Sequence, residues 1–244
     1  MMHTDCIGGG GAGNAVAELP PAQSPALFVK CLKVETHFAT EVAVLSRLSG
    51  LPGVVQLIAV DSARLAFVAS PVCKKLGAYR EKCVIFRMAV ELVSTFEKVH
   101  RMGFAHRDAR SGNFLVEMTA DGRAGRAVVC DWATAVRLDG EAVPYQGAVH
   151  FAADCVLQNL HEGKREFVYT AAMDLESLVK TVWDLLLPAA CDVLRVPRDD
   201  YGAMCGWWAR RAEEDKCLRR YLQCARETNY QGLIAQWDSI LPNR

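Results

Sequence analysis

The sequence predicts an α+β protein that begins with a small antiparallel sheet and one helix and continues with a larger, mainly helical part. Two observations support this fold class. In the first seventy residues, short apolar runs alternate with turns rich in glycine, proline and serine, a pattern typical of strands. After Pro71, apolar residues recur over long stretches at the spacing of one helix face.

Strands are expected on both sides of two turns near the N-terminus. Glycines crowd between Gly8 and Gly13, and an apolar run follows at 15–17. A proline-rich turn at 20–25 then leads into the apolar residues 27–30. This order predicts a strand, a tight loop, a second strand, a turn and a third strand.

A helix and two more strands complete the predicted sheet region. Apolar residues recur at helical spacing from Phe38 to Leu48, and the sequence Gly-Leu-Pro-Gly at 50–53 ends that pattern. Segments 54–60 and 65–69 are apolar runs joined by a short polar turn, which predicts two strands.

The rest of the chain is expected to be mainly helical. Residues 84–99 have a long amphipathic pattern, and 174–187 a strongly apolar one. Residues 203–240 mix charged residues with tryptophan, tyrosine and leucine as surface helices do, whereas 131–156 show little periodicity.

We expect a single domain in two parts. Residues 1–70 are predicted to form a small sheet-based N-terminal lobe, 71–76 a hinge, and 77–244 a larger, mainly helical C-terminal lobe. The 244 residues are enough for one large domain or two small lobes, and the sequence contains no internal repeat.

Composition excludes several function classes. Lysine plus arginine and aspartate plus glutamate number 28 each, so the formal charge is zero and binding to nucleic acid or an anionic membrane would need a local patch. The sequence has no run of about 18 apolar residues and no signal-peptide pattern. Ten cysteines without a Cys-x-x-Cys pair favour reduced core residues. We expect a cytoplasmic or nuclear protein without nucleic-acid or membrane partners.

The most informative stretch is His-Arg-Asp-Ala-Arg-Ser-Gly-Asn at 106–113. Asp108 and Asn113 are five residues apart, and Asp131 follows eighteen residues after Asn113, beyond two expected strands. Magnesium-dependent phosphoryl transfer needs such a set of side chains. One carboxylate orients the attacking hydroxyl and accepts its proton, while an amide oxygen and a second carboxylate hold the metal against the phosphates.

This stretch resembles the catalytic loop of the protein kinase superfamily. The resemblance implies a bilobal kinase-like fold with ATP and Mg²⁺ as cofactors. It makes Asp108 the catalytic base, makes Asn113 and Asp131 the metal ligands, and packs His106 behind the loop. The alternative is a chance His-Arg-Asp before a strand, which the order of the other motifs along the chain disfavours.

Upstream glycines fit the phosphate-binding loop of the same family. Gly8, Gly10 and Gly13 are in register with its G-x-G-x-x-G motif, in which backbone amides approach the ATP phosphates. A run of glycines matches several registers, however, and a flexible linker would look alike.

Lys30, on the expected strand that follows, resembles the kinase lysine that contacts the α- and β-phosphates. Glu41, on the expected helix, resembles the partner that holds this ammonium in place. Lys33 is a competing lysine, but it leaves only eight residues before Glu41, too few for a strand end and a helical turn. The alternative is a solvated lysine and a solvated glutamate.

Two downstream features extend the resemblance. Residues 147–157 look like a degenerate end of a kinase activation loop. Asp174 resembles the aspartate that opens the central helix and anchors the catalytic loop backbone, although it could also be a plain helix N-cap. Arg110 stands where many kinases have lysine and could neutralise the γ-phosphate as a planar fork.

The sequence also departs from the family pattern. Phe28 replaces the small residue that lies against adenine, and Ala15 replaces the usual valine of the preceding strand. Either the two changes trade volume or Phe28 blocks the nucleotide. The metal triplet is Asp-Trp-Ala at 131–133, without the glycine that permits a backbone flip. At 153–155 the glutamate that would pair with a buried arginine is missing, so this region must be braced otherwise.

The function expected from the resemblance is an ATP- and Mg²⁺-dependent protein kinase that acts on serine or threonine hydroxyls of a protein substrate. Because Thr134 and Tyr145 are the only hydroxyls between Asp131 and Gly147, we expect no switching by phosphorylation of this loop. Two alternatives stay open: a pseudokinase scaffold without turnover, and a small-molecule kinase of the aminoglycoside or choline type, which shares the catalytic loop.

Overall fold

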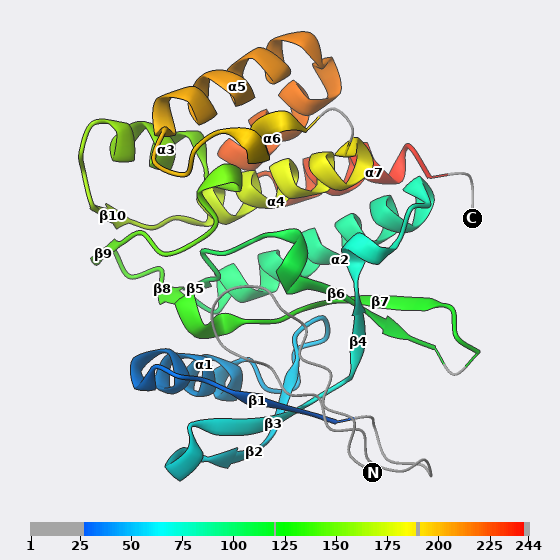
Figure 1. Ribbon diagram of the computed structural model, residues 1–244. Coiled ribbons are helices and arrows are strands. Elements are labelled where there is room, and N and C mark those ends of the chain that lie inside the picture. Colours follow the sequence, from blue (N-terminus) through cyan, green and yellow to red (C-terminus); the bar gives the residue numbers. More distant parts are fainter. Residues whose placement is uncertain (1–26, 120, 189–190, 242–244) are drawn as a thin grey trace.

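The computed structural model describes residues 27–119, 121–188 and 191–241 (Figure 1). Within these ranges the fold is α+β, as the sequence predicts. It contains small antiparallel sheets and seven α-helices. The expected glycine loop and first strands fall before residue 27 and lie outside the described residues.

The first sheet has three antiparallel strands in the order β1-β3-β2. These are β1 (Phe28–Cys31), β2 (Gln56–Asp61) and β3 (Ala66–Ser70), each within two residues of a predicted strand. Helix α1 (Glu35–Arg47) lies beside this sheet (Figure 1) and begins three residues before the apolar pattern does. Its first turn is polar, and for this reason the periodicity did not reveal it.

A second sheet joins this region to the helices. Strands β4 (Cys73–Lys75), β6 (Phe114–Met118) and β7 (Ala124–Val129) pair in the order β4-β6-β7. The turn before β2 reaches this sheet, since Val129 N–H donates to the Gly53 carbonyl at 2.8 Å and Val55 N–H to the Val129 carbonyl at 3.3 Å.

Two short ladders order the segment in which the sequence shows little periodicity. Strand β5 (Phe104–Ala105) pairs with β8 (Val136–Arg137), and β9 (Ala142–Pro144) pairs with β10 (Glu166–Val168). Strands of two or three residues are too short to give a readable sequence pattern.

Helices form the rest of the molecule. The two predicted long helices are present, and the C-terminal region contains three more. Their bounds are α2 (Lys82–Arg101), α3 (Asp154–His161), α4 (Ala171–Leu186), α5 (Tyr201–Glu214), α6 (Lys216–Arg226) and α7 (Tyr230–Asp238). Figure 1 shows α2 between the second sheet and α4, with α3, α5 and α6 beyond α4.

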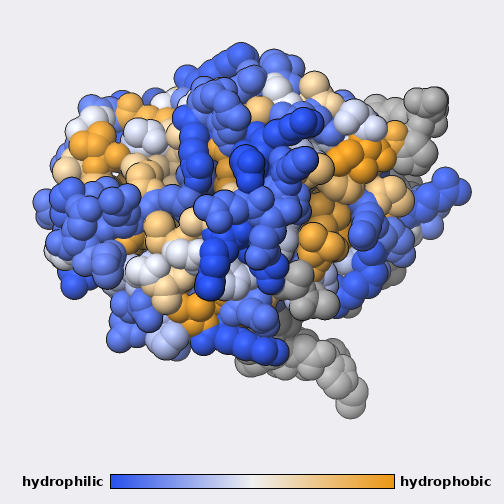
Figure 2. All heavy atoms as spheres, turned by 90° about the horizontal axis from the view of Figure 1, so that it is seen from above, coloured by the Kyte–Doolittle hydropathy of each residue, from blue (hydrophilic) through white to orange (hydrophobic). Residues whose placement is uncertain are grey.

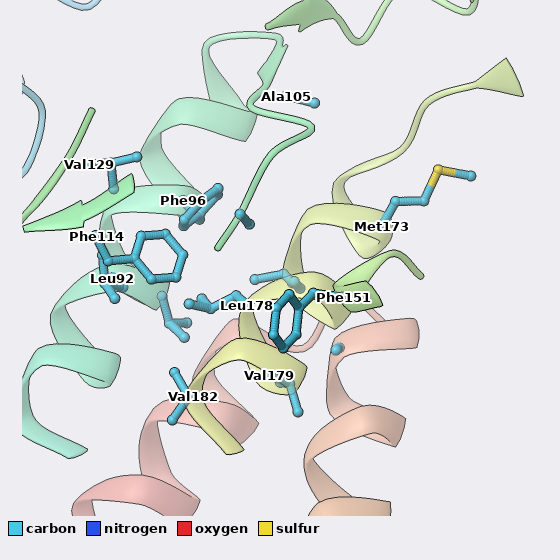
Figure 3. Packing of buried hydrophobic residues seen from close by; sticks show 14 of the residues in the cluster. Leu92, Phe96, Ala105, Phe114, Val129, Phe151, Met173, Leu178, Val179 and Val182 are labelled. Atoms are coloured by element: carbon cyan, nitrogen blue, oxygen red, sulfur yellow. The ribbon is translucent and has the colours of Figure 1, made fainter. Parts of the chain in front are cut away.

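The core is continuous from the second sheet to the outer helices. Phe96 of α2 meets Phe114 of β6 edge to face at 6.2 Å between ring centroids, and Leu178 of α4 belongs to the same buried cluster (Figure 3). On the outer side, Trp207 and Trp208 are buried. Seen from that side, the surface is mainly hydrophilic with separate apolar patches (Figure 2).

The predicted burial of the cysteines is wrong for most of those described, whereas their predicted reduced state agrees with the structure. Among the nine described cysteines, only Cys191 and Cys224 are buried, while the exposed ones are Cys31, Cys83, Cys155 and Cys217. Apolar neighbours in sequence do not fix which face of a strand or helix a residue occupies. All nine are free thiols. No described helix is both long and apolar enough to cross a membrane.

The turn between α1 and β2 allows a matched test of packing. Gly50 and Gly53 both have positive φ, at 77° and 88°, but a Cβ on Gly53 would lie 2.2 Å from Thr95 Oγ1, whereas a Cβ on Gly50 meets nothing within 4 Å. We expect Gly50→Ala to lower the free energy of unfolding by about 1–2 kcal/mol through backbone strain. We expect Gly53→Ala to lower it by about 1–3 kcal/mol more through overpacking.

Urea unfolding of the two variants measures this difference. Equal losses of stability in the two variants would show that the Gly53 turn does not pack on Thr95.

Candidate active site

Lys30 joins three segments that are distant in sequence. Its Nζ lies 2.9 Å from Glu41 Oε1 and 2.7 Å from Glu41 Oε2, and also 2.7 Å from Asp131 Oδ1. Lys30 comes from β1, Glu41 from the middle of α1, and Asp131 from the turn after β7. Lys30 is 6% exposed and Glu41 1% exposed, so this ion pair is buried in the interior of the protein. The expected Lys30–Glu41 pairing is present, and Lys33 takes no part in it.

Charge keeps the Lys30 ammonium protonated. Burial by itself would lower its pKa, but the carboxylates of Glu41 and Asp131 outweigh burial and raise the pKa above its ordinary value of 10.5. Burial would likewise raise the pKa of Asp131, but Lys30 outweighs it and holds that pKa below 3.8. In the more enclosed Glu41, burial outweighs Lys30 and raises the pKa.

The predicted catalytic loop folds around Asp108. Its Oδ2 accepts hydrogen bonds from Arg110 Nε and from Asn113 Nδ2, both at 2.8 Å, and its carbonyl accepts a second bond from Asn113 Nδ2 at 2.9 Å. Asp108 and Asn113 are buried, whereas the Arg110 side chain is 44% exposed. The five-residue spacing therefore brings the two side chains into direct contact.

Asp174 holds this loop from the side of α4. Its Oδ2 accepts from His106 N–H at 2.6 Å, and its Oδ1 accepts from Arg107 N–H at 2.8 Å. His100 Nε2 of α2 lies 3.1 Å from the same carboxylate. Asp174 lies in the first turn of α4, but Thr170 is the N-cap, so the anchoring role predicted for Asp174 is the correct one.

Trp132 contacts both the Lys30 cluster and the predicted catalytic loop. Its backbone N–H donates to Glu41 Oε1 at 3.1 Å, and its indole meets the His106 ring edge to face at 4.6 Å between centroids. The indole N–H donates to the Val129 carbonyl at 3.3 Å. Trp132 is fully buried, so the residue after Asp131 is fixed by packing and by two hydrogen bonds.

Arg107 binds only neutral oxygens. Its guanidinium donates to the carbonyls of Thr134 and Pro144, at 2.5 and 2.9 Å, and to Gln146 Oε1 at 3.1 Å. Burial lowers its pKa, against the weaker influence of nearby Tyr169 and other acidic groups. Together with the β9–β10 ladder, these bonds hold residues 134–146 against the predicted catalytic loop without an anionic partner among the described residues.

The next residues reach Asp108 itself. Ala148 N–H donates to Asp108 Oδ1 at 2.8 Å. A Cβ on Gly147 would lie 2.4 Å from the Arg107 carbonyl and 2.8 Å from Tyr145 Oη. The close approach of this segment to the loop therefore requires glycine at 147.

A partly buried cluster of four charged side chains lies where the sequence analysis noted a missing glutamate, at 153–155. Asp154 Oδ1 lies 2.7 Å from Lys180 Nζ, and its Oδ2 pairs with Arg226. Glu176 lies 3.2 Å from Lys180 and 3.3 Å from Arg226. Burial opposes ionisation of Glu176, but the two cations outweigh it and lower the pKa. The bracing that the sequence led us to expect in place of that glutamate is thus supplied by Asp154.

The oxygens near Asp108 suit magnesium. Asp131 Oδ2 and Asn113 Oδ1 accept no hydrogen bond from any described residue, and the Asp131 side chain is 38% exposed. Cys130 N–H donates to the Asn113 carbonyl at 3.1 Å, which keeps the two segments adjacent. Among the described residues no group of three or more His, Cys, Asp or Glu side chains could hold a metal ion. Asp131 and Asn113 offer one carboxylate and one amide. Mg²⁺ is commonly bound by such a sparse set together with phosphate oxygens.

Of the predicted site residues, the structure brings together Lys30, Glu41 and Asp131, and separately Asp108, Arg110 and Asn113. Gly8, Gly10 and Gly13 lie outside the described residues. The contacts of the Ala148 N–H and of Trp132 were not predicted. A backbone donor leaves no signature in the sequence, but a tryptophan directly after Asp131 can be read from it.

Comparisons with known proteins do not identify the chain. No protein-family model matches it, and no curated protein is similar enough in sequence to match it.

Asp131 should make stability depend on pH. Because its folded pKa lies below 3.8, its pairing with Lys30 stabilises the fold above that pH and is lost as the pH falls through the folded pKa. We expect Asp131→Asn, which mimics the protonated acid, to be less stable than the native chain at pH 7, and we expect this difference to be smaller at pH 2. Urea unfolding at both pH values tests this, and a pH-independent difference would contradict it.

Gly147→Ala should push the segment away from Asp108. We expect a loss of about 1–3 kcal/mol in the free energy of unfolding from overpacking, with faster hydrogen exchange at the Ala148 amide. The control is Gly206→Ala in α5, where a Cβ meets nothing within 4 Å. That variant should gain up to about 1 kcal/mol from helix propensity. Unchanged Ala148 exchange in Gly147→Ala would contradict the contact.

Proposed function

We propose that the chain is an ATP- and Mg²⁺-dependent protein kinase that transfers the γ-phosphoryl group to a serine or threonine hydroxyl of a protein. The proposal includes a bilobal kinase-like fold, with residues 1–70 and 77–244 as lobes and 71–76 as hinge. The supporting observation is that Lys30 binds Glu41 and Asp131 at once, next to a loop in which Asp108 contacts Asn113.

Each side chain has a role that follows from its surroundings. Asp108 orients the acceptor hydroxyl through its carboxylate. Lys30, charged and fixed by two acidic groups, binds phosphate oxygens of ATP. Asn113 Oδ1 and Asp131 Oδ2 are the oxygens that would hold Mg²⁺. When bound, the metal neutralises charge on the phosphates. Arg110, half-exposed beside Asp108, would neutralise charge on the γ-phosphate.

During transfer, one bond forms and one bond breaks at the γ-phosphorus. The acceptor oxygen forms a bond to the γ-phosphorus while the bond between that phosphorus and the β,γ-bridging oxygen breaks, so that ADP leaves with the electron pair. The hydroxyl proton passes to the Asp108 carboxylate. The products are a phosphate monoester on the protein, ADP and a proton that Asp108 returns to solvent.

The contacts of Arg107 support the expectation that loop phosphorylation does not switch this enzyme. Its guanidinium is already bound by three neutral oxygens, and the β9–β10 ladder holds the same segment. A phosphate is not needed to order residues 134–146. Tyr145 packs against Phe167 at 6.3 Å between ring centroids.

A pseudokinase is the second candidate function, and one observation favours it. Both oxygens of Asp108 already accept hydrogen bonds, from Arg110 and Asn113 on one side and from the Ala148 N–H on the other. An acceptor hydroxyl must share Oδ1 with that amide. Phe28, half-buried on β1, is the residue to examine for a closed adenine pocket.

The proposal is tested by transfer of labelled γ-phosphate from Mg-ATP to a mixture of protein substrates, in the native chain and in Asp108→Asn. We expect label on serine or threonine that falls by at least about a hundredfold in the variant, since general-base catalysis contributes that much. Binding of Mg-ATP by the variant is the control for folding.

Absence of transfer by the native chain, across substrates and metals, would overturn the kinase proposal in favour of the scaffold. Label on a small-molecule hydroxyl alone would instead support a small-molecule kinase.

A further inference from the structure

Four basic side chains lie on the exposed stretch that leads into α2. Lys74 and Lys75 end β4, Arg80 follows a 3-10 turn at Leu76–Ala78, and Lys82 is the first residue of α2. All four are exposed. We call them the basic rim. Glu81 is the only acidic residue between the first and the last of them.

The charges of the rim are not neutralised within the described part of the chain. None of the four side chains forms an ion pair there, and Arg80 Nη1 donates to the neutral Gly77 carbonyl at 3.0 Å. Glu81 accepts from the backbone N–H of Arg80 at 3.2 Å. On the adjoining hairpin, by contrast, Arg126 pairs with Glu117 at 2.6 Å. The rim charge is therefore available to a partner.

Helix energetics do not explain the lysine at position 82. The N-terminus of a helix carries partial positive charge and favours acidic residues. The first turn of α2 nevertheless contains Lys82 and no acidic residue, and the N-cap Glu81 makes no side-chain capping bond. A cation in this place adds to the positive potential of the helix end, so it suits an anion from outside.

The rim adjoins the candidate active site. In the β4–β6 pairing Lys75 lies opposite Leu115, two residues after Asn113. Strand β4 and the turn Leu76–Ala78 both contact Ser111–Asn113, the turn that follows Arg110. Arg110, which precedes this turn and is 44% exposed, pairs with the Asp108 carboxylate at 2.8 Å. The Lys74 and Lys75 end of the rim therefore lies next to the loop that carries Asp108.

We infer that the basic rim selects the protein substrate, and that the acceptor hydroxyl is carried on a segment rich in aspartate and glutamate. This inference rests on the proposed kinase function and names the substrate class of the same site. The acidic side chains pair with Lys74, Lys75, Arg80 and Lys82 while the hydroxyl lies at Asp108, and the bonds made and broken are those of the transfer step above.

An acidic peptide fits the rim better than nucleic acid does. Proteins that bind single strands combine basic grooves with exposed aromatic rings on which bases stack. The one aromatic residue of this stretch is Tyr79, which is half-buried and donates its hydroxyl to Met118 Sδ at 3.0 Å. The chain as a whole has no net positive charge to attract a polyanion.

The test uses three fluorescent peptides with one central serine, flanked by acidic, neutral or basic residues. Binding is measured by anisotropy without nucleotide at low salt, and phosphoryl transfer is measured with Mg-ATP. We expect the acidic peptide to bind about tenfold more tightly than the neutral one, since several exposed charge pairs act together. Its advantage in kcat/KM should be similar and should shrink with added salt.

The variant Lys74→Glu/Lys75→Glu should abolish this preference in both measurements. Lys216→Glu/Arg220→Glu on α6 makes the same change in net charge with exposed residues, and it should keep the preference. Loss of the preference in both double variants would overturn the role of the rim and point to net charge alone.

The remaining outcomes separate the two proposals. Transfer to all three peptides with equal kcat/KM would overturn the substrate class and leave the kinase function standing. Absence of transfer to any peptide or protein would overturn the kinase function, whatever the peptides bind. Displacement of the acidic peptide by an equal charge concentration of single-stranded DNA would overturn the selection for a protein segment.

Discussion

The Lys30 ammonium is the interaction on which the arrangement of the candidate site depends. It is nearly inaccessible to water and is bound by Glu41 and Asp131 together. Removing one partner of such a cluster leaves a buried charge without compensation, which is costly in free energy. Strand β1, helix α1 and the turn after β7 must therefore keep their relative positions. Trp132 extends this constraint to the catalytic loop, because its N–H is bound to Glu41 and its indole packs on His106.

Buried polar side chains connect the candidate site to the helices and to the segment that follows it. Asp174 binds two backbone N–H groups of the loop, and Lys180 is enclosed between Asp154 and Glu176. Arg107 differs, since it is held by carbonyl and amide oxygens. No carboxylate of the described residues pairs with this guanidinium. It holds the segment through directed hydrogen bonds, because three acceptors match the directions of its N–H groups.

Prediction from the sequence succeeded where the residue types and their spacing along the chain indicate the same site. The motif marked Asp108 and Asn113 as residues of one local loop, and the Lys30–Glu41 pair was expected from the resemblance to kinases. It was less successful where contacts are long-range or involve the backbone. Asp154 meets a residue 72 positions away, and the Ala148 N–H is a group every residue but proline has. No local pattern encodes either contact.

The β9–β10 ladder also affects how the chain tolerates change. Because Pro144 is paired with Glu166, the residues between them form a loop whose ends are fixed to each other. Within that loop, the turn at 162–164 is exposed and contains Gly163 at φ 83°. The entropy needed to close a loop grows only slowly with its length, and here the ends are already clamped. Extra residues inserted in this turn can therefore extend into solvent without breaking the hydrogen bonds of Arg107. The turn is thus a suitable place for sequence variation and for the attachment of a reporter group.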